Sequence, residues 1–373
     1  MRRNGRGAHR LTAIDLFAGA GGLSLAALKL DLDIRAAVDN DVHACKTYRK
    51  NIIERLGNPV ELAVCDISET RWPELLQKAG LQKGECDILL GGPPCQGFST
   101  HRINGAGVND PRNDLLLHYF AGMKVIKPKA FLVENVTGIL WPRHSRYLNR
   151  FLRSARDAGY RVFEPVVLNA RDFGVPQNRK RVFILGIRED AQWRGEWPPK
   201  ETHHSPESQL LEGAKARRWV TAAEVFALPL RPGDPNAIHM QHTSELRDVF
   251  RSTPKNGGSR YQSNRVLPCH KQHDGHKDVY GRIDPGRPGP TMTTGCVNPS
   301  KGRFVHPTAN HAITARHAAR FQTFPDDFVF EGGLMAAARQ IGNAVPILLG
   351  EIVVETVVRG LDLANEKAMA AAS

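Results

Sequence analysis

The chain has 373 residues, enough to bury a full hydrophobic core in about two domains. Its six cysteines form no Cys-x-x-Cys pair, which excludes a disulfide-rich secreted scaffold and favours a reducing compartment. The formal net charge of +13 favours a polyanionic partner such as nucleic acid, although a merely basic surface would carry the same charge.

The first predicted element is a buried strand over residues 11–17, which enters a glycine-rich turn and then an apolar helix over residues 23–28. Glycines let a ligand approach the backbone, and a helix N-terminus offers free N–H groups. We therefore expect a nucleotide-binding type of turn, although its spacing differs from the GxGxxG fingerprint and argues against a plain dehydrogenase. Asp15 interrupts this apolar run, and we expect no later run long enough to cross a bilayer.

The next two predicted strands end in acidic residues. Residues 34–38 lead to Asp39, and residues 60–64 lead to Asp66. A carboxylate at a strand tip can accept hydrogen bonds from both ribose hydroxyls, although Asp39 would serve equally well as the cap of a helix over residues 42–48. Three strand tips that face one crevice predict a pocket for an adenosine-like ligand.

A fourth predicted strand, residues 86–90, ends in two glycines and two prolines that precede Cys95. Because proline has no N–H for the hydrogen bonds of a sheet, the chain leaves the sheet at this turn. We therefore expect Cys95 at the carboxyl end of the strand, where ligands of open α/β sheets bind. The position favours a nucleophilic thiol, and the alternative is an inert Pro-Pro turn. The polar loop that follows, residues 100–110, is either a connector or a lid.

Charged residues lie next to the later predicted strands. The strand of residues 129–133 delivers Glu134, which either holds a proton in a desolvated crevice or caps the next segment. Arginines at spacings of three and four over residues 143–161 form either a solvated helix face or a phosphate-contacting one. Before the strand of residues 182–186, strand alternation places Arg179 and Arg181 on one side, as fixed donors.

From about Glu189 the strand and helix alternation stops, and polar residues and histidines dominate. The stretch of residues 269–276 could be read as a zinc cluster, but its ligands are crowded, and recognition loops fit it better. We therefore expect a catalytic domain over residues 1–188, a loop-rich domain over 189–305, and a return to the first domain over 306–373 that includes the C-terminal helix.

Six short motifs in this order resemble those of the cytosine-C5 DNA methyltransferases, of the compact type found in bacteria and their phages. The motifs begin at Asp15, Gly92, Glu134, Gln177, Arg320 and Gly342, and the resemblance runs to about Leu361. It implies an α/β fold, with a Rossmann-like SAM-dependent methyltransferase domain and a smaller, loop-rich target-recognition domain.

Carried over by position, the resemblance implies a role for each motif residue. Cys95 would attack cytosine C6, Glu134 would hold N3 and the exocyclic amine, Arg179 would contact O2, and Arg181 would support the loop. The residues implied to bind SAM are Phe17, Gly19, Gly21, Gly22, Asp39, Asn40, Asp66, Ile67, Pro93, Asn343 and Val345. Those implied to contact DNA are Gln96, Ser99, Arg112 and Thr291. No metal is implied.

The chemistry accounts for this set of residues. Cytosine C5 is a poor nucleophile until a thiolate adds at C6, and the charge that reaches N3 requires a proton donor. The base must also leave the duplex, so the resemblance implies base flipping, with S-adenosyl-L-homocysteine as product. We expect a monomer in the bacterial cytoplasm or nucleoid, bound to duplex DNA and partnered by a restriction endonuclease in function only.

Two alternatives share the same motifs. One is a tRNA cytosine-5 methyltransferase, whose Cys-Phe-Thr signature is absent from the variable region; the other is a catalytically silent DNA-binding relative, which the intact motif residues argue against. The sequence also departs from the family pattern at His311, where Arg is usual, and at His317, where Glu is usual. We expect both positions to be structural, and we expect the two histidines to change the contacts between the domains locally.

Overall fold

The computed structural model describes residues 10–94, 115–208, 217–264 and 278–372. An eight-stranded sheet forms the larger lobe, in the order β3-β2-β1-β4-β5-β8-β6, with β7 also paired to β8. The strands are β1 (Thr12–Leu16), β2 (Asp33–Asp39), β3 (Glu61–Val64), β4 (Ile88–Gly91), β5 (Ala130–Asn135), β6 (Tyr160–Val162), β7 (Val166–Asn169) and β8 (Lys180–Arg188). The first five strands run parallel, and β8 runs antiparallel to its neighbours.

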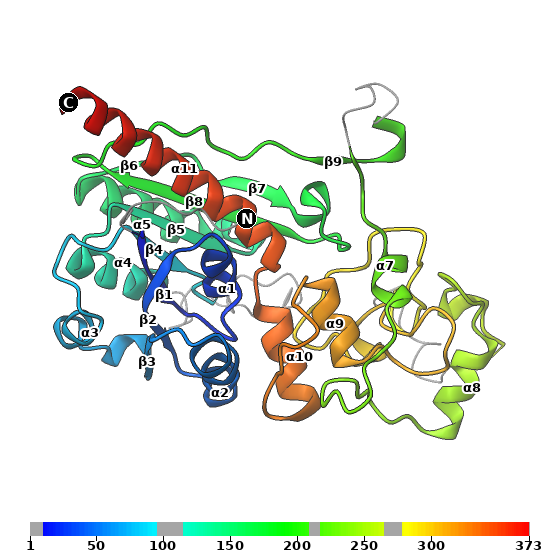
Figure 1. The fold of residues 1–373 in the computed structure, drawn as a ribbon. Helices are drawn as coiled ribbons and strands as arrows, with labels where there is room; N and C mark the ends of the chain where they lie inside the picture. The colour runs from blue at the N-terminus through cyan, green and yellow to red at the C-terminus, as the bar shows by residue number, and fades with distance from the viewer. Residues whose placement is uncertain (1–9, 95–114, 209–216, 265–277, 373) are drawn as a thin grey trace.

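Helices cover both faces of the sheet, which confirms the predicted α/β fold (Figure 1). One face carries α1 (Gly22–Lys29), α2 (Val42–Tyr48), the π-helix η1 (Arg49–Arg55) and α11 (Ile347–Ala372), and the other carries α3 (Trp72–Lys78), α4 (Leu115–Ile126) and α5 (Ser145–Asp157). Because successive side chains of a strand point to opposite faces, Ala13 packs in one core and Ile14 in the other. The strand order reverses between β1 and β4, where open sheets bind ligands.

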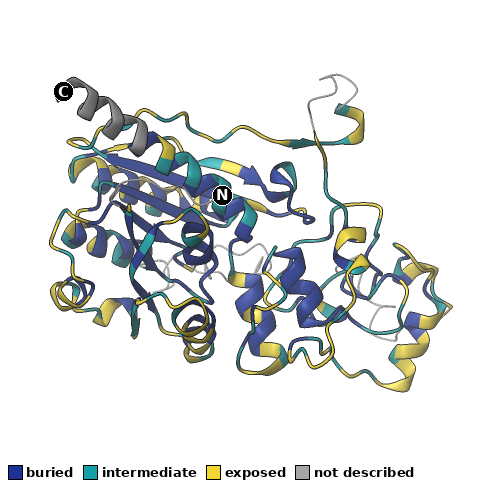
Figure 2. Cartoon of the chain, viewed as in Figure 1, coloured by how far each residue is buried: buried dark blue, intermediate teal, exposed yellow. Residues whose placement is uncertain are grey.

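Short 3₁₀ segments connect these elements and the second lobe. They are η2 (Ile67–Glu69), η4 (Thr137–Leu140), η5 (Pro142–His144), η6 (Ala170–Phe173), η7 (Arg260–Gln262) and η9 (Pro299–Lys301). The second lobe is loop-rich, with β9 (His203–His204), β10 (Arg217–Arg218), α7 (Ala222–Ala227), α8 (Ser244–Ser252), α9 (Ala315–Phe321) and α10 (Gly333–Asn343). Figure 2 shows that α9 is buried, whereas α8 lies at the exposed end of the lobe.

A single hydrophobic cluster joins residues on both sides of the expected boundary at 305. Ile283 and Phe304 share this core with Phe321 and Ile341, and Val305 forms a bridge to Ala312. This core therefore crosses position 305, and it also includes Leu25 of α1 and Ile347 of α11. At the other boundary, Trp193 and Trp197 still pack against the core of the sheet lobe.

One helical stretch among the described residues, Gly333–Leu361, is apolar and long enough to cross a membrane, contrary to our expectation from the sequence. Two helices form it, separated at Pro346. On α11, Val353, Val354 and Val357 have no exposed surface and pack in the same core as Leu23 of α1. The composition of this stretch is explained by its burial inside the protein.

The two unusual histidines lie inside the second lobe, not between the lobes. His311 stacks on His239 with ring centroids 4.0 Å apart, and His317 packs against Phe226 at 5.0 Å. His317 also completes the capping box of α9: Thr314 Oγ1 accepts from its backbone N–H, and its Nδ1 accepts from Thr314 N–H. A neutral imidazole thus replaces the carboxylate that usually fills this position.

We predict that His317 makes the second lobe sensitive to acid. Burial, with His306 as the next cause, lowers the pKa of His317 from 6.5 to about 3. Its contribution to folding is therefore complete above pH 6.5 and is lost as the pH falls toward 3. At about pH 5 this loss should be about 2 kcal/mol.

The substitution His317→Gln keeps a side-chain acceptor at the capping position and removes the titrating ring. We expect the variant to resemble the wild type near neutral pH and to lose less stability on acidification. Urea unfolding followed across this pH range measures both effects. Equal acid sensitivity of the two proteins would contradict the prediction.

Candidate active site

The carboxyl ends of the parallel strands meet at one edge of the sheet. There β4 ends at Gly91, where an added Cβ would lie 2.5 Å from the Tyr119 ring and 3.0 Å from the Leu16 carbonyl oxygen, so a larger residue would not fit. The Pro93 carbonyl accepts a hydrogen bond from Asn135 Nδ2 at 3.2 Å, which joins the end of β4 to the end of β5. The described chain stops at Pro94 on this edge, and Cys95, Gln96, Ser99 and Arg112 lie outside the described residues.

Glu134 lies at the same edge, on β5, with 7% of its surface exposed. An added Cβ at Gly92, three residues before Cys95, would lie 3.4 Å from Glu134 Oε2. Arg181 Nε lies 2.8 Å from Glu134 Oε1. Burial raises the pKa of Glu134, and the charges of Arg181 and Arg179 oppose this rise. The site thus holds a carboxyl group suited to keeping a proton next to the turn that leads to Cys95.

Arg179 has no exposed surface, and its hydrogen-bond partners differ from those of Arg181. Its guanidinium donates to the carbonyl of Met292 at 2.7 Å, of Gly342 at 2.7 Å and of Ala344 at 2.9 Å. These carbonyls belong to the second lobe and to the link between α10 and α11. The structure thus places Arg181 against Glu134 and places Arg179 among carbonyl groups of the second lobe and of the link between α10 and α11.

Strand alternation does not apply to Arg179, because β8 begins only at Lys180. The residues just before β8 instead form hydrogen bonds with the second lobe. Gln177 donates to the Phe321 carbonyl at 3.0 Å and to Gln322 Oε1 at 2.8 Å, and its own Oε1 accepts from Met292 N–H at 2.7 Å. Thr291 Oγ1, on the side of the second lobe, donates to the Asn178 carbonyl at 2.6 Å.

Gln177 and Gln322 are structural residues to which the sequence analysis assigned no role. Both side chains are fully buried, and Gln322 Nε2 donates to the carbonyls of Ile341 and Ala344. The signal for them was a polar amide inside an otherwise apolar or basic motif, since a buried amide needs partners for all of its polar atoms.

Asp39, at the tip of β2, is positioned by the glycine turn. Its Oδ2 accepts from Gly19 N–H and its Oδ1 from Asp41 N–H, both at 2.8 Å. Asp41, and not Asp39, caps α2 by accepting from His43 and Ala44 N–H, which removes the alternative role of Asp39. Each oxygen of Asp39 keeps a lone pair, so this carboxylate can still accept hydrogen bonds from a ligand.

The neighbouring strand tips lie beside Asp39. Asn40 Nδ2 donates to Asp66 Oδ2 at 3.4 Å, and Asp66 caps η2, where hydrogen bonds from Ser68 lower its pKa. Ile67, the first residue of η2, is buried. The acidic tips of β2 and β3 therefore form one continuous polar rim.

The glycine turn between β1 and α1 adopts left-handed backbone angles at Phe17, Gly19 and Gly21, with φ of 58°, 56° and 93°. Asp15 anchors this turn: its Oδ2 accepts from Ser24 N–H at 3.1 Å and from Ser24 Oγ at 2.6 Å. Burial raises the pKa of Asp15 to about 7. The turn is thus held by a buried polar group and presents backbone without large side chains.

The link between α10 and α11 lies against the glycine turn. An added Cβ at Gly22 would lie 3.0 Å from the Val345 carbonyl oxygen, so the link contacts the first turn of α1. Val345 is buried, and Asn343 is exposed at the end of α10. All the described residues implied to bind SAM therefore lie along this one edge. A carboxylate with free lone pairs above a glycine turn fits an adenosine-type group.

Comparisons with known proteins agree with this geometry. Residues 11–359 match the family of C-5 cytosine-specific DNA methylases. The chain is 31% identical over 392 residues to the type II methyltransferase M.XorII of Xanthomonas oryzae pv. oryzae, covering 96% of this chain and 87% of that protein. It is 32% identical over 350 residues to M1.HphI of Haemophilus parahaemolyticus, covering 94% of this chain and 87% of that protein.

Solved structures show the same fold. A protein described as a DNA modification methyltransferase, encoded within an Escherichia coli prophage, matches with a TM-score of 0.66 at 24% identity, over 94% of this chain and 99% of that one. The Dnmt2 methyltransferase of S. pombe matches with a TM-score of 0.57 at 17% identity, over 94% and 99%. Together with the match along residues 11–359, the motifs and the sheet show that the chain belongs to the C-5 cytosine-specific DNA methylase family.

Proposed function

We propose that this DNA methyltransferase transfers the methyl group of S-adenosyl-L-methionine to C5 of a cytosine flipped out of a specific duplex DNA site. The observation that carries the proposal is the buried Glu134, which pairs with Arg181 beside the turn that leads to Cys95. A titratable carboxyl and a fixed cation at the sheet edge, with a cysteine next in sequence after Pro94, match what activation of a pyrimidine requires.

S-adenosyl-L-methionine, when bound, supplies an electrophilic methyl group. In our proposal Asp39 accepts hydrogen bonds from its ribose hydroxyls, and Asp66, with Asn40 and Ile67, holds the adenine. Asn343 and Val345 close the crevice, and Pro93 forms its wall on the side of β4. The remaining cofactor contacts are the turn residues Phe17, Gly19, Gly21 and Gly22. No metal enters the proposal.

The reaction that we propose uses Cys95 as a thiolate, which forms a covalent bond to C6 of the flipped cytosine. Electron density then moves toward N3 and C5. Glu134, in its acid form, donates a proton to N3 and accepts a hydrogen bond from the exocyclic amine. After C5 has gained the methyl group, solvent water accepts the C5 proton, the bond between sulfur and C6 breaks, and the thiolate is restored. N3 then returns its proton to Glu134, which restores the acid form of the carboxyl group.

Arg181 is the residue to which we assign the cytosine O2, because it reaches the carboxyl group of Glu134 and is only partly buried. Arg179 is a positioning residue in this proposal, since its donors are committed to three carbonyl oxygens. Gln96, Ser99, Arg112 and Thr291 remain the proposed DNA contacts. We place recognition of the DNA site in the second lobe, and the protein in the bacterial cytoplasm or nucleoid as a monomer that a restriction endonuclease accompanies in function.

The first test is methyl transfer from tritiated S-adenosyl-L-methionine to duplex DNA, with tRNA as a parallel substrate. We expect label on DNA, and loss of that label in the variant Cys95→Ala, because no other thiol occupies the turn. Bisulfite sequencing of the product then identifies the cytosine and its site. Label on tRNA alone would contradict the proposal.

A second test distinguishes the proposed roles of Arg181 and Arg179. Arg181→Gln should fold normally and lower kcat by about 100-fold, because a donor to a developing charge is lost. It should also move the alkaline fall in activity to higher pH, since Arg181 holds the pKa of Glu134 down.

Arg179→Gln should instead lower the free energy of unfolding by at least about 2 kcal/mol, because it leaves buried carbonyl groups without partners. Urea unfolding and steady-state kinetics on both variants provide the comparison. A stable but inactive Arg179→Gln, together with a fully active Arg181→Gln, would restore the reverse assignment.

A further inference from the structure

Helix α5 has one apolar and one strongly basic face. The apolar face, which packs in the core, consists of Leu148, Phe151, Leu152 and Ala155. Arg146, Arg150 and Arg153 lie on the other face, are exposed and follow one another at spacings of four and three. The helix therefore presents a row of guanidinium groups to solvent.

Within the described parts of the chain, no acidic side chain pairs with this row. The sequence contains no Asp or Glu between Glu134 and Asp157, and Arg146, Arg150 and Arg153 form no ion pair with any residue that the structure describes. Arginines on other exposed helices do have acidic partners one turn away, as in the pairs Arg251–Asp248 and Arg359–Glu355. A purely solvated helix face usually mixes charges of both signs, so the row on α5 differs from an ordinary surface.

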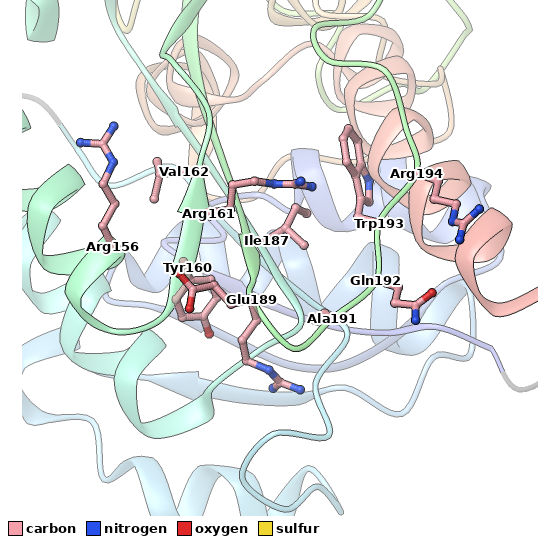
Figure 3. A pocket seen from close by; sticks show the side chains of 11 residues that line it. Arg156, Tyr160, Arg161, Val162, Ile187, Glu189, Ala191, Gln192, Trp193 and Arg194 are labelled. Atoms are coloured by element: carbon pink, nitrogen blue, oxygen red, sulfur yellow. The ribbon is translucent and has the colours of Figure 1, made fainter. Parts of the chain in front are cut away.

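The row continues into a surface hollow of about 800 Å³ at the end of α5. Figure 3 shows Arg156, Arg161 and Arg194 around it, together with Trp193 and Glu189. Arg161 stacks over Phe163 and Trp193, which fixes its guanidinium without neutralising it. We call Arg146, Arg150, Arg153, Arg156, Arg161 and Arg194 the arginine band.

The band begins near the candidate active site and leads away from it. Helix α5 follows β5 through η4 and η5, so its first turn lies toward the edge that carries Glu134. Its thirteen residues span about 20 Å along the sheet. The hollow lies at the opposite edge, where Tyr160 pairs with Arg188 at the end of β8. The band therefore lies outside the crevice of the strand tips and cannot contact the target base.

We propose that the arginine band binds the phosphate backbone of duplex DNA that flanks the target site. This inference rests on the proposed function and adds to it a contact that is independent of sequence. The planar guanidinium donates two parallel hydrogen bonds to a phosphate, and each neutralised phosphate releases counterions. Every cation between Lys129 and Lys180 is an arginine, the residue whose geometry suits phosphate best. The band reads no base edges and so contributes affinity rather than specificity.

The test uses the full chain with Arg146, Arg150 and Arg153 all replaced by Gln, which keeps helix propensity. Binding is measured on a duplex that spans only the target site and on a duplex several times longer, over a series of salt concentrations. We expect the wild type to bind the longer duplex more tightly and the variant to lose this gain. On the longer duplex, the slope of log Kd against log salt should fall by about 2 to 3 units.

Two further variants control for charge and for folding. The replacement of the same residues by Lys should restore most of the salt slope, because the charge returns. The replacement of Arg71, Lys78 and Lys83 by Gln removes the same charge from the exposed surface near α3 and should leave the dependence on duplex length unchanged. Methylation of the short duplex should persist in all three variants.

The outcomes separate this inference from the proposed function. If all the proteins methylate DNA but the Gln variant of α5 keeps the length dependence and salt slope of the wild type, the arginine band is not a DNA contact. The same holds if the control variant near α3 loses them equally. If the wild type methylates no DNA, the proposed function fails, while the binding measurements still decide whether the band contacts DNA.

Discussion

The structure depends most on the buried guanidinium of Arg179. A charged group in the protein interior is costly unless its donors find partners, and here the two terminal nitrogens of Arg179 donate to the carbonyl oxygens of Met292, Gly342 and Ala344. These carbonyls come from the second lobe and from the link between α10 and α11. One side chain therefore sets the position of both lobes relative to β8, and through β8 the position of Arg181 against Glu134.

The amides of Gln177 and Gln322 extend this connection. They join the segment before β8 to α9 and to the end of α10 through hydrogen bonds that are entirely buried. A network of this kind rigidifies a junction because each lost bond leaves a desolvated polar group behind. The same junction carries the link that contacts the first turn of α1 and the segment that leads into β8 and Arg181.

Charge is distributed unevenly over the larger lobe. At the carboxyl edge the cations are buried and paired: Arg181 lies against Glu134, and Arg179 lies among carbonyl oxygens. Along α5, Arg146, Arg150 and Arg153 are exposed and form no ion pair with any described residue, whereas Arg156 pairs with Glu164 at 3.7 Å. Buried cations act on one defined group, whereas exposed ones act on any polyanion within about a Debye length, roughly 10 Å. The net charge of +13 thus includes arginines of two kinds, buried ones with fixed partners and exposed ones on the surface.

The sequence by itself determined the sheet, the glycine turn, the acidic strand tips and the family. These features depend on local backbone preferences and on the rule that parallel strands end at one edge. Only the tertiary structure decided the contacts of Arg179 and Arg181, the capping of α2 by Asp41 in place of Asp39, and the core that joins Ile283 and Phe304 to Phe321 and Ile341. Each of these depends on where a side chain points or on which residues share a core. The carbonyl partners of Arg179, for example, lie 113 to 165 residues away along the chain, and local sequence patterns carry no information about such contacts.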